Sequence, residues 1–129
     1  MSEPIAFISH FGVKADKRDD FARLFQESAD RLKADKPRTL VFLGYLHDTG
    51  TQVSFLHVFA DAESLDVHFQ GADERARAAY EYLEPNGWEL YGRPSQQALE
   101  TLQHAAASAG VALSVEPDFL GGFLRLRSP

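Results

Sequence analysis

The pattern of apolar and polar residues predicts a strand and then a helix at the start of the chain. Residues 5–11 form a short apolar and aromatic run that Gly12 interrupts, which is typical of a strand buried on both faces. Asp16 can cap a helix that Pro37 stops, and between them apolar residues recur at helical spacing: Phe21, Leu24, Phe25, Ala29 and Leu32. One face of this helix is therefore expected to lie on a sheet.

Two runs of strand-forming residues, 39–47 and 52–59, flank the turn-forming residues 48–51 and predict a β-hairpin. If the hairpin pairs symmetrically about its turn, alternation divides its side chains between two faces. One face carries Val41, Leu43, Tyr45, His47, Gln52, Ser54, Leu56 and Val58. The other carries Leu40, Phe42, Gly44, Leu46, Val53, Phe55, His57 and Phe59. Both faces are mainly apolar, so the hairpin needs a cover on each side: helices on one, and a partner subunit, a ligand or both on the other.

A second helical region and a fourth strand follow the hairpin. Asp61 can begin a helix on which Leu65, His68 and Phe69 share a face. Gly71 interrupts this pattern, which resumes as a helix over residues 72–83. A Pro-Asn-Gly turn then precedes a strand at residues 88–91. The order is βαββαβ, a ferredoxin-like α+β arrangement with helices on one face of an antiparallel sheet.

The rest of the chain predicts a C-terminal helix and strand extension. Ser95 can cap a third helix, and residues 111–115 and 119–126 are expected to add two strands. We therefore expect one domain over residues 1–94, with residues 95–129 packed on that domain or on a dimer partner.

The second hairpin strand and the helix after it resemble the antibiotic biosynthesis monooxygenase (ABM-like) domains of the dimeric α+β barrel superfamily. The residues that carry the resemblance are Phe55-Leu56-His57-Val58-Phe59 and Ala60-Asp61-Ala62-Glu63-Ser64-Leu65-Asp66-Val67-His68, within a match over roughly residues 5–92. The resemblance implies a homodimer in which two sheets pack face to face into a barrel, with a cleft between helices and sheet in each subunit.

The family that the chain resembles includes cofactor-free oxygenases, which act on quinols and polyketide-like phenols, and haem-degrading enzymes. The resemblance therefore makes both activities candidates. The haem-ligating histidine of the haem-degrading enzymes corresponds to a place near Ala78 and Ala79, and Phe59 stands where their cleft tryptophan lies. Haem is therefore not expected. We predict a cofactor-independent monooxygenase of a small aromatic or quinol-type substrate; the alternative is a non-catalytic dimer that binds a small apolar molecule.

Two histidines are the candidate catalytic residues. His57, among phenylalanines, has the ordinary pKa of a general base near neutral pH, and His68 could orient a ligand oxygen. A core histidine bonded to backbone or carboxylate is the more common role for a residue such as His57, and His68 could equally lie at the helix surface with its ring half exposed. Candidate substrate-binding residues are Phe42, Phe55, Phe59, Tyr45, Tyr80 and Trp88, although aromatic residues at such spacings are more often core.

The composition argues against nucleic-acid binding, a membrane span, disulfides and a metal site. The formal charge of −6 opposes binding to nucleic acid, and no apolar stretch approaches a membrane span. Without cysteine there is no disulfide or thiolate site, and the five histidines lack a ligand-pair spacing, so no metal is expected. The charged run Asp73-Glu74-Arg75 predicts a solvated helix face. The lack of cysteine makes the cytoplasm the expected compartment, and with no basic segment ahead of the first apolar run we expect no targeting segment.

Overall fold

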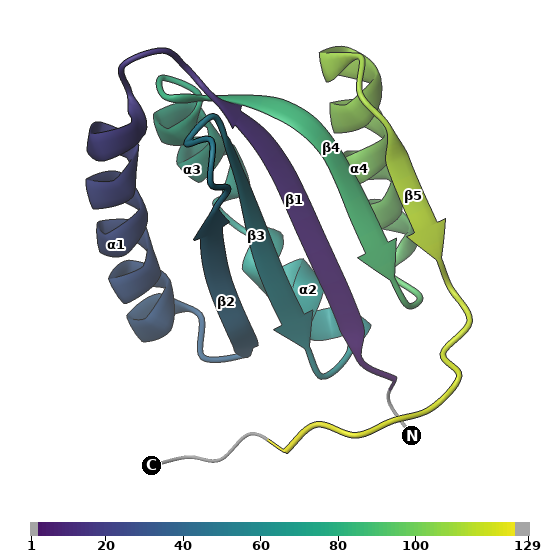
Figure 1. Ribbon diagram of the computed structural model, residues 1–129. Helices are drawn as coiled ribbons and strands as arrows, with labels where there is room; N and C mark the ends of the chain where they lie inside the picture. Colours follow the sequence, from purple (N-terminus) through teal and green to yellow (C-terminus); the bar gives the residue numbers. More distant parts are fainter. Residues whose placement is uncertain (1–2, 126–129) are drawn as a thin grey trace.

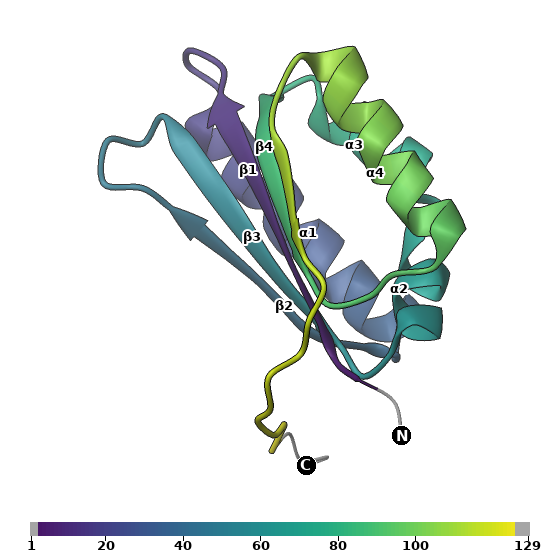
Figure 2. The ribbon, with the colours of Figure 1, turned by 90° about the vertical axis from the view of Figure 1, so that its right-hand side faces the viewer.

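A computed structural model describes residues 3–125 as one sheet with helices on a single face (Figure 1). The strands are β1 (Ile5–Val13), β2 (Thr39–Leu46), β3 (Gln52–Phe59), β4 (Leu83–Tyr91) and β5 (Leu113–Glu116). The helices are α1 (Arg18–Asp35), α2 (Ala62–Phe69), α3 (Ala72–Ala79) and α4 (Gln96–Ala109). In the side view the helices lie to one side of the sheet and leave its other side uncovered (Figure 2). We call these sides the helix face and the open face.

The sheet order is β2-β3-β1-β4-β5. The first four strands pair antiparallel, as predicted, and β5 adds parallel to β4 after the crossover through α4. The complete sheet is therefore mixed. The predicted α+β ferredoxin-like fold, with a helix and a strand added at its C-terminal end, is confirmed.

The hairpin has the predicted register. Tyr45 pairs with Ser54, and Phe42 pairs with His57. In β1, Phe7 also lies opposite His57, so these three side chains share the helix face. The residues between them alternate to the open face, which settles which of the two apolar faces the helices cover.

Two predicted caps form as expected. The Asp61 carboxylate accepts a hydrogen bond from the backbone N–H of Ser64, 2.8 Å away, at the start of α2. Ser95 caps α4 in the same way. The prediction for Asp16 is wrong: α1 begins after Lys17 without a side-chain cap, and Asp16 itself takes a left-handed backbone with φ of 63°.

Several elements after α2 differ from the sequence prediction. The helix expected to reach residue 83 ends at Ala79, and Leu83 already begins β4. That strand runs through Pro85, which is tolerated because the β1–β4 pairing shifts register between His10 and Phe11. The last expected strand, 119–126, is absent from residues 119–125, and Leu126 lies outside the described residues.

The core lies between the sheet and its helices. Its most completely buried side chains come from three strands and one helix: Ile5, Phe59, Leu65, Leu83 and Leu90. On α4 the buried positions are Ala98, Leu102 and Ala106, whose spacing presents one apolar stripe to the sheet. Among the described helices, none is long and apolar enough to cross a membrane.

Candidate functional site

Two buried histidines meet between the sheet and α2. His57 points from β3 to the helix face, and His68 points back from the last turn of α2. Their ring centroids are 5.2 Å apart and their planes are inclined by 73°. Each residue is only 5% exposed. The alternation of β3 and the helical phase of α2 therefore bring together the two residues that the sequence proposed as catalytic.

Each ring uses Nδ1 to bond with the protein. His57 Nδ1 donates to the backbone carbonyl of Phe7 at 3.0 Å, because a carbonyl oxygen can only accept. His68 Nδ1 lies 2.8 Å from Thr39 Oγ1. With Nδ1 carrying the proton in neutral His57, its Nε2 presents a lone pair.

The Nε2 atoms have no hydrogen-bond partner within residues 3–125. In the same residues every fully buried side-chain nitrogen and oxygen has one. Neither Nε2 atom is therefore completely buried, although each residue is only 5% exposed.

Burial keeps both imidazoles neutral. Desolvation lowers the pKa of His57 to about 4, with a smaller lowering from the Arg75 charge and an opposing effect of the Phe7 carbonyl. Desolvation, followed by the charges of His57, Arg75 and Lys36, lowers the pKa of His68 to about 3. At pH 7 the pair therefore consists of two uncharged rings that can accept a hydrogen bond, and each is a weaker base than an exposed histidine.

Aromatic rings enclose the pair. Phe7 and Phe42 each have ring centroids 5.1 Å from that of His57. Phe59 lies 5.2 Å from His68 and stacks on His57 at 6.2 Å. Phe69 completes the enclosure at 5.8 Å from Phe7. The surroundings are therefore apolar, which accounts for the lowered pKa values.

Arg75 is the polar residue near this cluster that sequence reasoning missed. It lies on α3 and is half-buried, whereas its neighbours Asp73 and Glu74 are exposed as the charged run predicts. Its guanidinium donates to the backbone carbonyls of His68 and, at 3.1 Å, Gln70. The only signal in the sequence was an arginine shortly after the helix that carries His68, which does not by itself predict an inward orientation.

Similar proteins are found by structure and not by sequence. No family model matches the sequence, and no curated protein matches it either. Solved structures do match. MupZ from Pseudomonas fluorescens superposes with a TM-score of 0.69 at 16% identity, over 96% of each chain.

Two further matches are shorter proteins. A mutant of SnoaB, a cofactor-independent oxygenase from Streptomyces nogalater, has a TM-score of 0.60 at 15% identity, with coverage of 71% of this chain and 94% of SnoaB. A candidate antibiotic biosynthesis monooxygenase from Chloroflexus aurantiacus has a TM-score of 0.56 at 11% identity, covering 68% of this chain and 90% of its own. This chain has an ABM-like fold. At these identities the likeness concerns the fold alone. These two proteins are shorter than this chain by about as many residues as α4, β5 and the tail contain.

The ABM-like fold brings together only part of the predicted substrate-binding set. Phe42 and Phe59 contact the histidine pair, and Phe55 joins them through Phe42 at 6.1 Å. Tyr45 lies on the opposite, open face, 57% exposed, because it is an odd number of positions from Phe42 on the same strand. The structure therefore does not bring Tyr45 together with the histidine pair, and its part in substrate binding stays a prediction.

Trp88 and Tyr80 belong to a neighbouring cluster. Their rings lie 6.3 and 6.4 Å from that of Phe11. Trp88 is buried there, whereas Tyr80 sits at the end of α3 and is 38% exposed. Among residues 3–125 no three His, Asp or Glu side chains are placed to hold one metal ion.

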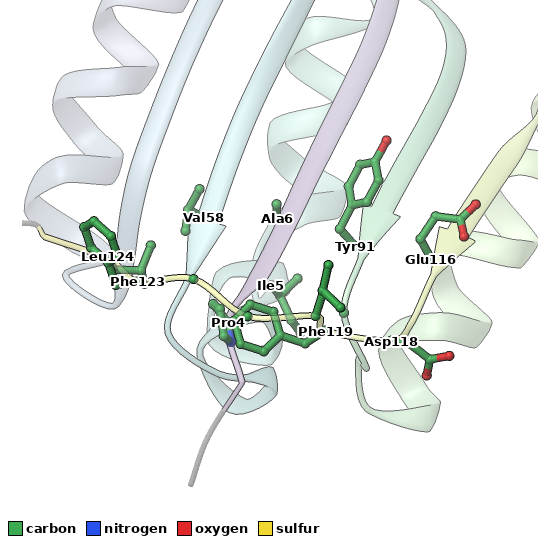
Figure 3. A pocket seen from close by; sticks show the side chains of 14 residues that line it. Pro4, Ile5, Ala6, Val58, Tyr91, Glu116, Asp118, Phe119, Phe123 and Leu124 are labelled. Carbon is green, nitrogen blue, oxygen red and sulfur yellow. The ribbon is translucent and has the colours of Figure 1, made fainter.

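A cavity of about 360 Å³ lies on the open face of this ABM-like fold, at the foot of the sheet. Ala6, Val58 and Tyr91 line it from the strands, and the tail after β5 runs below them in the view of Figure 3 and contributes Phe119 and Phe123. This cavity is separated from the histidine pair by the thickness of the sheet. It is therefore a second place where a small molecule could bind.

Proposed function

We propose that this chain is a cofactor-independent monooxygenase of a small aromatic or quinol-type substrate, and that its site is the pair His57–His68. The observation that carries the proposal is the pair itself: two neutral imidazoles with open Nε2 atoms inside an apolar aromatic enclosure. The ABM-like fold, which SnoaB shares, supports the same reaction class.

The residues have distinct roles in this proposal. An electron-rich phenolate or quinol supplies the electrons for oxygen, so the protein's task is to bind it, deprotonate it and exclude water. His57 Nε2 accepts the proton of the substrate hydroxyl, and His68 orients the second oxygen. The Arg75 guanidinium, whose charge reaches both histidines, offsets the negative charge that develops on the substrate.

Access to the pair is proposed to run past α3. This helix has no buried residue and begins at Gly71, which adopts a left-handed backbone with φ of 79°. An element with so little buried surface opens at a low free energy without unfolding the sheet. Movement of α3 would also carry Arg75 toward or away from a bound substrate.

Oxygen uptake with a panel of hydroquinones tests the proposal. We expect turnover by the wild type and a loss of about 10²-fold or more in kcat for His57→Ala and His68→Ala, as is usual when a general base is removed. Arg75→Met should lower kcat, because it removes the positive charge beside the pair. His104→Ala is the matched control, because His104 is an exposed histidine on α4. Uptake that is absent, or equal in wild type and His57→Ala, would refute the role of the pair.

A second candidate function is a dimer that binds a small apolar molecule without reaction. The open-face cavity favours it, since its lining from the strands and tail is mainly apolar. Thermal-shift screening separates the two functions: stabilisation by apolar ligands that persists in His57→Ala, together with no oxygen uptake, would favour binding alone.

We also propose that two copies associate through the open face, and that small apolar or aromatic molecules are their ligands. Large apolar side chains stand exposed on this face and on the tail: Leu43, Tyr45, Tyr91, Phe119, Leu120, Phe123 and Leu124. Contact between two such surfaces would remove them from water. Light scattering at micromolar concentration should give the mass of a dimer, and a monomer would contradict the association.

A further inference from the structure

A row of hydrogen-bonded polar side chains crosses the open face, on the side of the sheet away from the histidine pair. Ser54 Oγ lies 2.9 Å from His10 Nδ1, and His10 Nε2 lies 2.5 Å from Glu89 Oε2. At the ends of the row, the Tyr91 hydroxyl donates to Glu89 Oε1 at 2.7 Å, and His47 Nε2 lies 3.2 Å from Ser54 Oγ. Serine, imidazole and carboxylate thus stand in series at hydrogen-bond distance.

The strand register builds this series. Ser54 of β3 and His10 of β1 are direct cross-strand partners. Gly87 of β4 faces His10 on its other side and has no side chain, which leaves room for the ring to reach Glu89, two residues further along β4. Three adjacent strands therefore hold the three groups, which is a more rigid support than a loop.

The protonation pattern follows from the hydrogen bonds. Bonds from His10 and Tyr91 hold the pKa of Glu89 below its usual range, so its carboxylate only accepts. His10 Nε2 must then carry the proton, and Nδ1 of the neutral ring presents its lone pair to the Ser54 hydroxyl. His47 Nε2, the remaining neighbour, can donate to Ser54 Oγ. A serine whose proton points at a carboxylate-oriented imidazole has the arrangement of an activated nucleophile.

We propose that Ser54 is the nucleophile of a second site, which hydrolyses esters or thioesters of apolar carboxylic acids. Ser54 Oγ bonds to the carbonyl carbon and its proton passes to His10 Nδ1. The leaving alcohol or thiol departs with that proton and leaves an acyl-serine. Water then adds to the acyl carbon while His10 again takes a proton and returns it to Ser54 Oγ, which releases the acid. Glu89 is a positioning residue, and His47 Nε2–H is the donor to the carbonyl oxygen.

The acyl group has an apolar path on the same face. The path starts at the pair Ser54 and His10 and passes the next open-face pair, Leu56 of β3 and Ile8 of β1. It reaches the open-face cavity at the pair Val58 and Ala6. Ser54 and Val58 are four residues apart, about 13 Å along an extended strand. A medium-length acyl chain can therefore lie between the nucleophile and the cavity. If two copies associate through this face, the same path lies in the space between their sheets.

A fluorophosphonate probe tests the nucleophile directly. We expect one adduct per chain by intact mass, mapped to Ser54 in the wild type, and none in Ser54→Ala. The rate with p-nitrophenyl octanoate should exceed that with p-nitrophenyl acetate and should fall at least about tenfold in Ser54→Ala and His10→Gln. Ser114→Ala is the matched control, because Ser114 is exposed on the same face beside Glu89 and forms no bond with a histidine in the described residues.

Glu89→Gln distinguishes a positioning role from a merely structural one. We expect a lower kcat at an unchanged KM, since the ring loses the carboxylate that orients it while the path for the acyl group is left intact. An adduct on another residue, no adduct under conditions that label a known serine hydrolase, or equal ester turnover in wild type and Ser54→Ala would overturn the proposal. Adduct mapping uses the wild type, so it remains decisive if Ser54→Ala does not fold. Oxygen uptake reports on the histidine pair and adduct mapping reports on Ser54, so failure of this site and failure of the oxygenase are distinguishable.

Discussion

Acidification from pH 7 to pH 5 should destabilise the fold through the buried histidines. In the unfolded chain each histidine has a pKa of about 6.5, whereas folding lowers the pKa of His57 to about 4 and that of His68 to about 3. The unfolded state therefore binds more protons than the folded state as the pH falls below about 6.5. Linkage then requires the free energy of unfolding to fall as the pH falls. The stabilisation is complete above about pH 6.5 and is lost as the pH falls from there toward the folded-state pKa values.

The size of the effect follows from these pKa values. Between pH 7 and pH 5 each histidine removes about 2 kcal/mol from the free energy of unfolding, so the pair removes about 4 kcal/mol. For a domain of ordinary stability this is a large fraction of the total. Carboxylates contribute little to the difference, since their ordinary pKa values lie below pH 5.

Urea denaturation at pH 7, 6 and 5 measures this effect. The fluorescence of Trp88 suits the assay, because it is the only tryptophan and is 7% exposed in the folded state. His57→Leu and His68→Leu should each remove about half of the pH dependence, whatever their stability at pH 7. The exposed-histidine variant His104→Gln should keep all of it. A free energy of unfolding that is flat from pH 7 to pH 5, or an undiminished slope in the double variant, would refute the reasoning.

Two further predictions concern packing and capping. Gly44→Ala should destabilise the protein by about 1–3 kcal/mol in urea denaturation, because a Cβ there would overlap the ring of Phe25 from α1; Gly12→Ala, where a Cβ meets nothing closer than 4.0 Å, should change it far less. Asp61→Ala should cost about 1 kcal/mol, since its carboxylate accepts from both the backbone N–H and the hydroxyl of Ser64. An Asp61→Asn variant retaining most of that stability would support the capping explanation, whereas an unchanged Asp61→Ala would contradict it.

The parts of the fold that sequence predicted are those set by local chemistry. The turn at residues 48–51 fixes the hairpin register, and alternation then places His57 and Phe42 on one face and Tyr45 on the other. Asp61 and Ser95 act as caps because each is followed by a backbone N–H that its side chain can reach. The same rule failed at Asp16, where a left-handed backbone directs the chain before α1 begins.

The parts that sequence could not predict depend on contacts between distant segments. The Phe7 carbonyl and Thr39 fix the histidine rings from strands far from them in sequence. Arg75 turns inward because two carbonyls at the end of α2 are available to it. Likewise, the series Ser54–His10–Glu89 exists only after three strands are in register.

The position of β2 at the margin of the sheet has a consequence for handling the protein. This eight-residue strand pairs only with β3 among the described strands, so half of its backbone N–H and C=O groups point outward. Leu43, Tyr45 and Leu46 stand exposed along it, and none of its eight residues is charged or proline. Such a margin readily accepts a strand from another molecule. Concentrated samples are therefore the condition under which linear association would compete with a closed pair, and Leu46→Lys, an exposed position on the helix face of β2, is the change that would suppress it.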